Sequence, residues 1–371
     1  MAHYTRCLKL AEQYNGQYEI LFLHSNEYGH LVSAAGYETF ESLTFNAKEV
    51  IEKAKSFDFS WLNYKDIKKI AINQAQVIKL LQPDLVLSDT MPTLKIASEI
   101  SKVPCHVLMN AYMSKYYDKK RQLSRTHGAY WFLQLFPSHV SSQVTSFFET
   151  ISMHLVHKPF KKLRDEFDLK YVNNLLSEIE GDQNLICDDP NIFPVNKLPQ
   201  NYKLLGPILG NSSDCEQQLI KSLNPQIKTI TICMGSSGNW DQMKILNDLP
   251  KAKYNIIACG SGSDLLNAKH IYSRSWVNLD KILPVTDLFI CHAGNGTVYK
   301  GIEHRCIMLF STHHFEQEWN AHRFEATGFG IDISEYKPIE VLNKIESVLE
   351  KEQERIPTLE HNFDIDNALW I

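Results

Sequence analysis

Apolar residues along this chain follow two alternating patterns. From Cys7 to Tyr14 they recur at the i, i+3, i+4 and i+7 spacing of a helix, which Gly16 ends. Short apolar runs typical of buried strands alternate with such helical segments. In the first half, strands are predicted at 18–24, 84–88, 103–109 and 184–187, and helical segments at 47–81 and 124–176. This alternation indicates a parallel sheet covered by helices.

The second half repeats the pattern more regularly. Strands are predicted at 229–234, 254–259, 287–291, 307–310 and 330–333, and a last helix at 338–351. A segment rich in Gly, Ser, Asn and Pro, 206–226, separates the halves. We therefore predict an α/β protein with two Rossmann-like domains, 1–205 and 227–350, joined by the linker 206–226. The tail, 351–371, ends in apolar residues and is expected to cross back to the first domain.

The predicted start of the first domain is unusual. A Rossmann-like domain normally begins with a strand, which lies in the middle of the doubly wound sheet. Here residue 1 already lies at the entrance of a helix. We expect that an upstream strand of about six residues has been lost. The alternative is a domain that contains a gap.

Composition and net charge limit the classes of function that are compatible with the sequence. The chain has 371 residues, 44% of them hydrophobic, which is enough for two cores. Its 38 basic and 43 acidic side chains give a net charge of -5, so nothing favours a nucleic acid as partner. The eight cysteines form no CxxC pair, and neither a signal peptide nor a membrane span is predicted, so we expect a cytoplasmic protein. The aromatic stretch 130–136 could touch a membrane, although core or pocket wall is the commoner role.

The sequence His-Ala-Gly-Asn-Gly-Thr at 292–297 carries the candidate chemistry. It follows a predicted strand and opens a helix, where unpaired backbone N–H groups and the positive helix end would bind a diphosphate. Gly294 and Gly296 let the backbone approach the phosphates. Asn295 and Thr297 add hydrogen-bonding side chains, while His292 either orients the turn or donates to a phosphate oxygen.

Further elements around this turn resemble the nucleotide-sugar signature of the UDP-glycosyltransferase superfamily, glycosyltransferase family 1, including its bacterial macrolide branch. In order along the chain, the matching elements are Trp276, the turn 292–297, the strand 307–310, the pair Glu316-Gln317 and the pair Asn320-Ala321. The resemblance implies a GT-B fold, with two Rossmann-like domains facing across a cleft. It also implies transfer of a sugar from a nucleotide-sugar, UDP-sugar being the family's usual donor.

The resemblance assigns roles residue by residue. Trp276, followed by Val277, would border the base, although core packing is the alternative for this tryptophan. The turn 292–297 would hold the diphosphate, and Glu316 and Gln317 would bind the sugar hydroxyls. A Gly-Ser turn after the first strand of the second domain would also face the diphosphate; its residues here are Gly235, Ser236 and Ser237.

Lys300 departs from the family pattern. The family usually has a Glu at this position, which accepts hydrogen bonds from the ribose hydroxyls. Lysine cannot accept, so the ribose must be held differently and the base is left open. Two arrangements are open for Lys300: a point charge that reaches the diphosphate, or a solvated side chain.

The resemblance places the catalytic base in the first domain. The opening residues 2–8 are similar to the family's G-H-x-x-x-x-L turn, whose His takes the acceptor proton. His3 suits this role because its ordinary pKa is near neutrality. Asp89, at the end of a predicted strand, would orient His3 as the Asp of a triad does. The alternatives are a disordered His3 and a helix-capping Asp89.

No metal and no cofactor beyond the nucleotide-sugar is expected. Asp364-Ile365-Asp366 matches a D-x-D string, but in the tail, and His313-His314 has no third ligand at a suitable spacing. The expected reaction is a metal-independent inverting displacement at an acceptor hydroxyl. The acceptor, a small molecule, glycan or lipid-like compound, would contact the region 112–176.

Three other classes of protein stay open. A non-catalytic nucleotide-sugar-binding protein is favoured by Lys300 and the missing strand. A nucleotide-sugar epimerase shares the GT-B architecture but should carry further carboxylates. A dinucleotide-dependent oxidoreductase has the least support, because neither Gly-rich turn completes G-x-G-x-x-G.

Overall fold

The computed structural model describes residues 2–55, 58–210, 216–236, 238–250 and 253–350, together with Leu359. These residues divide into two compact units, one within Met1–Ile208 and one within Leu209–Glu360. The division falls inside the segment predicted as a linker. Ser237 and nearly all of the tail 351–371 lie outside the described residues, so the predictions made for them stay predictions.

The first unit is an α/β unit whose paired strands are all parallel. Its strands form a four-stranded sheet, β3-β4-β5-β6, and a two-stranded sheet, β1-β2. In chain order its elements are α1 (Ala2–Gln13), β1 (Leu21–Leu23), α2 (Gly29–Ala34), β2 (Glu38–Phe40), α3 (Ala47–Lys55), α4 (Tyr64–Leu81), β3 (Val86–Asp89), α5 (Leu94–Ser101), β4 (Cys105–Met109), η1 (Ala111–Met113), α6 (Tyr130–Leu133), α7 (Ser138–Glu166), α8 (Leu175–Glu178), β5 (Gln183–Ile186) and β6 (Tyr202–Leu204).

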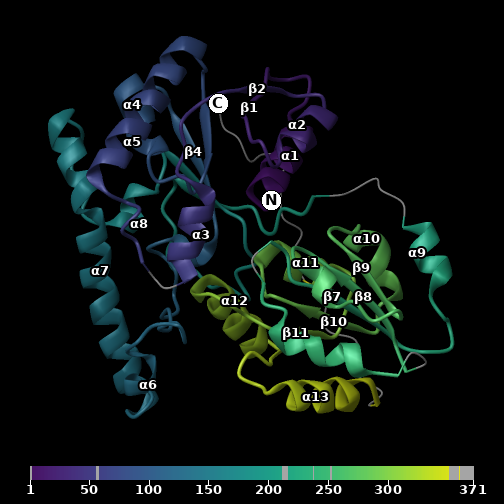
Figure 1. The fold of residues 1–371 in the computed structure, drawn as a ribbon. Helices are drawn as coiled ribbons and strands as arrows, with labels where there is room; N and C mark the ends of the chain where they lie inside the picture. The colour runs from purple at the N-terminus through teal and green to yellow at the C-terminus, as the bar shows by residue number, and fades with distance from the viewer. Residues whose placement is uncertain are drawn as a thin grey trace. The chain divides into compact units, whose positions relative to one another are not determined.

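Local sequence explains where the long helix α4 begins and ends. The Asn63 side chain accepts a hydrogen bond from the Asp66 N–H and so caps the first turn. At the other end Gln82 adopts a left-handed conformation, φ 50°, just before Pro83. The buried face of α4 packs against α5 and α7, which cover the same side of the unit (Figure 1). The helical stretch predicted at 47–81 is therefore two helices with a break between them.

The second unit is built around one parallel sheet of six strands. The strand order is β12-β11-β10-β7-β8-β9, so the first strand of the unit, β7, lies beside the fourth, β10. Its elements are α9 (Gln217–Ser222), β7 (Thr229–Cys233), η2 (Asp241–Asp248), β8 (Asn255–Cys259), η3 (Ser263–Leu265), β9 (Ile271–Arg274), α10 (Leu279–Ile282), η4 (Leu283–Val285), β10 (Leu288–Cys291), α11 (Asn295–Glu303), β11 (Met308–Phe310), α12 (Phe315–Ala326), β12 (Ile331–Asp332) and α13 (Pro338–Glu350). This is the doubly wound order of a Rossmann-like unit, so the α/β class is confirmed.

Three short strands, β2, β6 and β9, were not predicted from the sequence. Each lies at the edge of its sheet, and each is only partly buried, so none shows a continuous apolar run. The predicted linker 206–226 also contains the helix α9, whose Leu219 packs with Ile257 and Val277. The strand expected upstream of residue 1 stays a prediction.

Within the described part of the chain, no helix has the length and apolar composition needed to cross a bilayer. The seven cysteines in that part, all except Cys215, are free thiols.

Candidate active site

In the second unit the candidate nucleotide site lies where the strand order reverses. β7 and β10 are neighbours in register, Cys233 opposite Cys291, and each is followed by one of the predicted Gly-rich turns. A third turn, after β8, joins them, because the Ser261 N–H donates to the Gly235 carbonyl at 2.8 Å. The carboxyl ends of neighbouring strands at such a reversal are the usual place for a ligand in this kind of sheet.

His292 holds two of these turns together. Its ring lies so close to Gly235 and Gly294 that a Cβ on Gly235 would be 2.7 Å from the imidazole Cε1. Nδ1 lies 3.2 Å from the Cys233 carbonyl, which can only accept, so Nδ1 carries the proton. Burial lowers the pKa of His292 to about 4, and the ring is therefore neutral. In this state Nε2 is an acceptor, which favours an orienting role over donation to phosphate.

The first turn of α11 is open to an anion. Gly294 is the N-cap residue and provides no capping side chain, and the first turn contains no acidic residue. Gly296 is exposed, and nothing lies within 4 Å of the place where its Cβ would be. The turn is held in shape by Asn320, whose Nδ2 donates to the Ala293 carbonyl at 3.0 Å, while Ala293 has a left-handed φ of 58°. Backbone amides in this setting bind anions well.

The helix α12 brings the predicted sugar-binding pair near the same turn. The charges of His314 and Glu316 both act on the pKa of His292, which shows their proximity. Gln317 is buried, and its Oε1 accepts a hydrogen bond from the His313 N–H at 2.8 Å. This contact closes the loop between β11 and α12. Contact of Glu316 and Gln317 with a sugar stays a prediction.

Trp276 does not pack in the core of the second unit. Its side chain is 42% exposed, whereas the neighbouring Val277 is buried against Leu219 and Ile257. The core alternative for Trp276 is therefore wrong. An exposed indole is available to stack on a base. The serine of the β7 turn that the structure describes, Ser236, is also exposed.

Lys300 has neither of the two predicted arrangements. It is 7% exposed, so a solvated side chain is excluded, and its ammonium group already has two carboxylate partners. Nζ lies 2.5 Å from Asp280 and 3.0 Å from Glu303. These partners were not predicted, although Glu303 lies one helical turn after Lys300.

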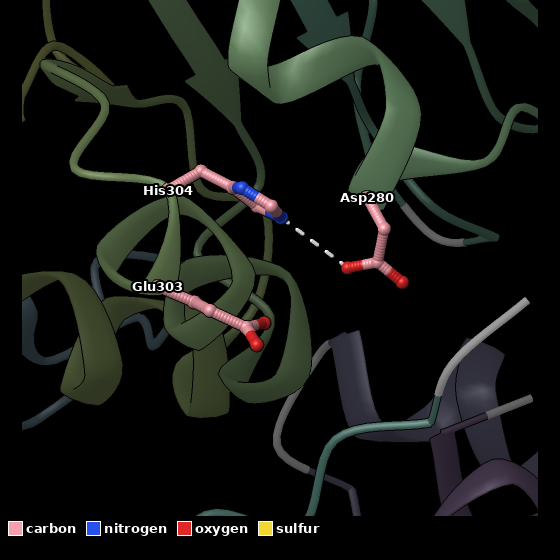
Figure 2. A group of neighbouring side chains, drawn as sticks. All are labelled: Asp280, Glu303 and His304. Atoms are coloured by element: carbon pink, nitrogen blue, oxygen red, sulfur yellow. Dashed lines mark hydrogen bonds and ion pairs between the residues drawn. The ribbon is translucent and has the colours of Figure 1, made fainter.

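The same cluster has the geometry of a metal site. Figure 2 shows Asp280 on α10 and Glu303 and His304 at the end of α11, with His304 Nε2 3.3 Å from Asp280. One ligand atom from each of the three lies within 4.8 Å of the others. However, the Lys300 ammonium group contacts two of the three side chains and would have to be displaced by an ion. The cluster is therefore a network of ion pairs around a buried lysine.

In the first unit His3 and Asp89 are neighbours, as predicted. His3 Nδ1 lies 3.1 Å from Asp89 Oδ1, and His3 is exposed while Asp89 is not. A second partner was not predicted: Arg6 binds the Asp89 carboxylate through two nitrogens, with Nε 2.9 Å from Oδ2. Arg6 Nη1 also donates to Asn110 Oδ1 at 2.8 Å, which ties the carboxyl ends of β3 and β4 to α1. The i, i+3 spacing of His3 and Arg6 places both on one face of α1, and this spacing could have indicated Arg6 as a second partner of Asp89.

Arg6 determines the charge state of Asp89 and so the effect of Asp89 on His3. Burial alone would raise the pKa of Asp89, but the charges of Arg6 and His3 outweigh it and hold that pKa far below its usual value. The carboxylate is thus permanently ionised and already neutralised by a guanidinium group. Its remaining effect on His3 is to accept the Nδ1 proton, which leaves Nε2 as the basic nitrogen.

Comparison with known proteins finds similarity to glycosyltransferases. No protein-family model matches the chain. A PGL/p-HBAD biosynthesis glycosyltransferase of Mycobacterium tuberculosis is 21% identical over 337 residues, covering 89% of this chain and 78% of the relative. An inactive PGL/p-HBAD biosynthesis glycosyltransferase of Mycobacterium bovis is 22% identical over 249 residues, covering 66% of this chain and 67% of the relative.

Solved structures share the fold over nearly the whole chain. The calicheamicin glycosyltransferase CalG4 matches with a TM-score of 0.64 and 13% identity, covering 93% of this chain and 86% of its own. Glycosyltransferase VinC, solved in complex with dTDP, matches with a TM-score of 0.62 and 14% identity, covering 94% and 89%. Together with the strand order of the second unit, these similarities show that the chain has the GT-B fold of glycosyltransferases.

Proposed function

We propose that this protein transfers a sugar from a nucleoside diphosphate sugar to an acceptor hydroxyl, by a metal-independent single displacement that inverts the anomeric centre. The observation that carries this proposal is the uncapped first turn of α11, which lies at the strand-order reversal of the second unit. The amides there would hold the diphosphate and stabilise the charge that develops on it as it leaves. His292 would orient this turn, as its contacts with Gly235 and Gly294 indicate.

The chemical step needs a base on the acceptor side. We assign this role to His3, whose Nε2 would take the acceptor proton while the hydroxyl oxygen bonds to the anomeric carbon. The bond from that carbon to the diphosphate oxygen breaks in the same step. Asp89 would act as a positioning residue that fixes the tautomer of His3, and Arg6 would fix Asp89 in turn.

The ion pairs of Lys300 affect which nucleotide the site is expected to bind. The resemblance to the UDP-glycosyltransferases implies a UDP-sugar, but the ion-paired lysine offers no acceptor for ribose hydroxyls. A deoxyribose has one hydroxyl fewer to satisfy, and the similar protein VinC was solved with dTDP. We therefore propose thymidine diphosphate as the second candidate nucleotide.

A panel of nucleoside diphosphates and their sugars tests this function. A true donor nucleotide at one hundred times its dissociation constant should stabilise the protein by about 2.7 kcal/mol in thermal unfolding. Transfer or slow hydrolysis of the donor should then be measurable. His3→Ala should reduce transfer by about a hundredfold or more and leave nucleotide binding unchanged. Transfer at the wild-type rate by this variant would exclude His3 as the base.

The second candidate function is a nucleotide-sugar-binding protein without activity. Two observations favour it: the departure at Lys300, and the similarity to a relative named as inactive. Such a protein would be stabilised by a nucleotide in the same panel, yet would neither transfer nor hydrolyse any sugar. If no nucleoside diphosphate stabilised the chain, both functions would be wrong.

A further inference from the structure

Eight large apolar side chains are exposed on the helices α6 and α7 and on the turn between them. They form what we call the α6–α7 patch: Trp131, Phe132, Leu135, Phe136, Phe147, Phe148, Ile151 and Leu155. Trp131 is 69% exposed and Leu135 is 79% exposed, which is far more than core residues show. Several large apolar side chains exposed on neighbouring elements normally mark an interaction site.

The two helices that carry the patch are tied together. The Ser141 hydroxyl donates to the carbonyl of Leu133, at 2.5 Å, and lies 3.3 Å from that of Phe136. Figure 1 shows α6 lying at the N-terminal end of α7, at one edge of the first unit. The aromatic rings of Phe132 and Phe136 contact each other with centroids 5.3 Å apart.

The patch lies on the outward side of α7, because the opposite side of this helix is buried. Phe160 and Leu163 are fully buried there, and Arg164 is bound to Glu99 and Glu178. Helical spacing places Phe147, Ile151 and Leu155 on the outward face. Lys158 continues the same face and is exposed, whereas the Lys162 ammonium group lies over the Tyr64 ring of α4, 4.0 Å from its centroid. The outward face of α7 is therefore apolar along its N-terminal half, and beyond Leu155 it carries charges of both signs, with Lys158 and Asp165 exposed.

The stretch of sequence that contains α6 carries no acidic residue. From Lys119 to Phe148 the sequence contains no Asp or Glu, although the whole chain has a net charge of -5. Lys119 and Lys120 begin this stretch and are exposed, and the first acidic residue after it, Glu149, is paired with Arg121 at 2.8 Å. Aromatic and leucine side chains flanked by lysines are the composition that binds the interface of an anionic membrane.

We propose that the α6–α7 patch binds the surface of an anionic lipid bilayer, with the apolar side chains in the headgroup region and the lysines on lipid phosphates. The lysines complement an anionic surface. In a symmetric dimer of this chain, by contrast, the same patch with the same lysines would have to pack against itself. The interaction is peripheral and does not depend on the sugar-transfer function, so the two can be tested separately.

Vesicle co-sedimentation of the full chain tests the proposal. We expect more binding to vesicles of phosphatidylcholine and phosphatidylglycerol, at a ratio of about three to one, than to phosphatidylcholine alone, and less at high salt. The double variant Trp131→Ser/Phe132→Ser should lower the partition coefficient by about tenfold or more. Lys119→Glu/Lys120→Glu should lower only the binding to anionic vesicles.

The test has a matched control variant and two outcomes that would contradict membrane binding. Leu80→Ser removes a side chain that is 82% exposed on α4 and does not belong to the patch, so this variant should bind vesicles like the wild type. All these positions are exposed, so unchanged thermal unfolding should confirm the fold of each variant. Wild-type protein that stays in the supernatant with both vesicle types would overturn the proposal. So would a dimer in light scattering that Trp131→Ser/Phe132→Ser converts to a monomer without any vesicle binding.

Discussion

At the scale of single residues, a buried neutral histidine makes the stability of the protein depend on pH. His292 is 9% exposed, and burial lowers its pKa to about 4 from an ordinary value of 6.5. The unfolded chain therefore binds one more proton than the folded chain between these two pH values. Because stability rises with pH wherever the unfolded state binds more protons, the protein should lose stability as the pH falls through this window.

His292→Gln should remove this part of the pH dependence. Between pH 6.5 and pH 4 the wild type should lose up to about 3 kcal/mol of unfolding free energy relative to the variant, and lose no more below pH 4. Urea unfolding at a series of pH values would measure the difference. Parallel pH curves for the two proteins would show that His292 is not the buried neutral group described here.

At the scale of secondary structure elements, α7 depends on a buried charge network. Arg164 is 2% exposed and Glu178 is fully buried, with Nη2 2.7 Å from Oε1. His157 Nε2 lies 2.7 Å from the other oxygen of Glu178, and Arg164 Nη1 lies 2.7 Å from Glu99. The network joins α7 to α5 and α8, and so holds the buried face of a helix whose other face carries the apolar patch.

Arg164→Met should destabilise the first unit strongly. The variant leaves the Glu178 carboxylate buried without its guanidinium partner, which costs about 3–5 kcal/mol in comparable cases. Arg164→Met/Glu178→Gln should cost less than the two single changes added together, because the uncompensated charge is gone. Lys9→Met breaks an exposed pair with Glu12 and should cost less than about 1 kcal/mol. Equal losses in Arg164→Met and Lys9→Met, measured by urea unfolding, would contradict this account.

At the scale of the whole molecule, the sequence predicted the layout well where burial is continuous. The strands β4, β7, β8 and β10 are fully or almost fully buried apolar runs, and each was predicted within two residues of its ends. Edge strands such as β2 were missed because exposed positions break the apolar pattern. Helix α9 was missed because its short sequence lies among turn-forming residues.

The candidate site was predicted less completely. The spacing of the motif identified the turn 292–297 and the pair of His3 and Asp89, which the structure brings together. Most partners of the buried charges come from distant elements, as with Arg6 on Asp89 and Asp280 on Lys300, and helical spacing indicates only partners on the same helix. Lys300 was therefore given two roles, and the ion-paired arrangement that the structure shows was not among them.

The central claim is that the first turn of α11 binds the diphosphate of the donor, and a pair of variants at Gly296 tests it most directly. A side chain added there meets open space, so neither variant should disturb the fold. A carboxylate in the first turn should stabilise the helix by about 0.3–1 kcal/mol. The same carboxylate should repel a bound diphosphate.

We therefore expect Gly296→Glu to bind UDP or thymidine diphosphate at least about tenfold more weakly than Gly296→Gln in calorimetric titration, while unfolding at the same or a higher temperature. The glutamine variant has almost the same shape and separates the effect of charge from that of size. Equal dissociation constants for the two variants would show that the diphosphate is bound elsewhere.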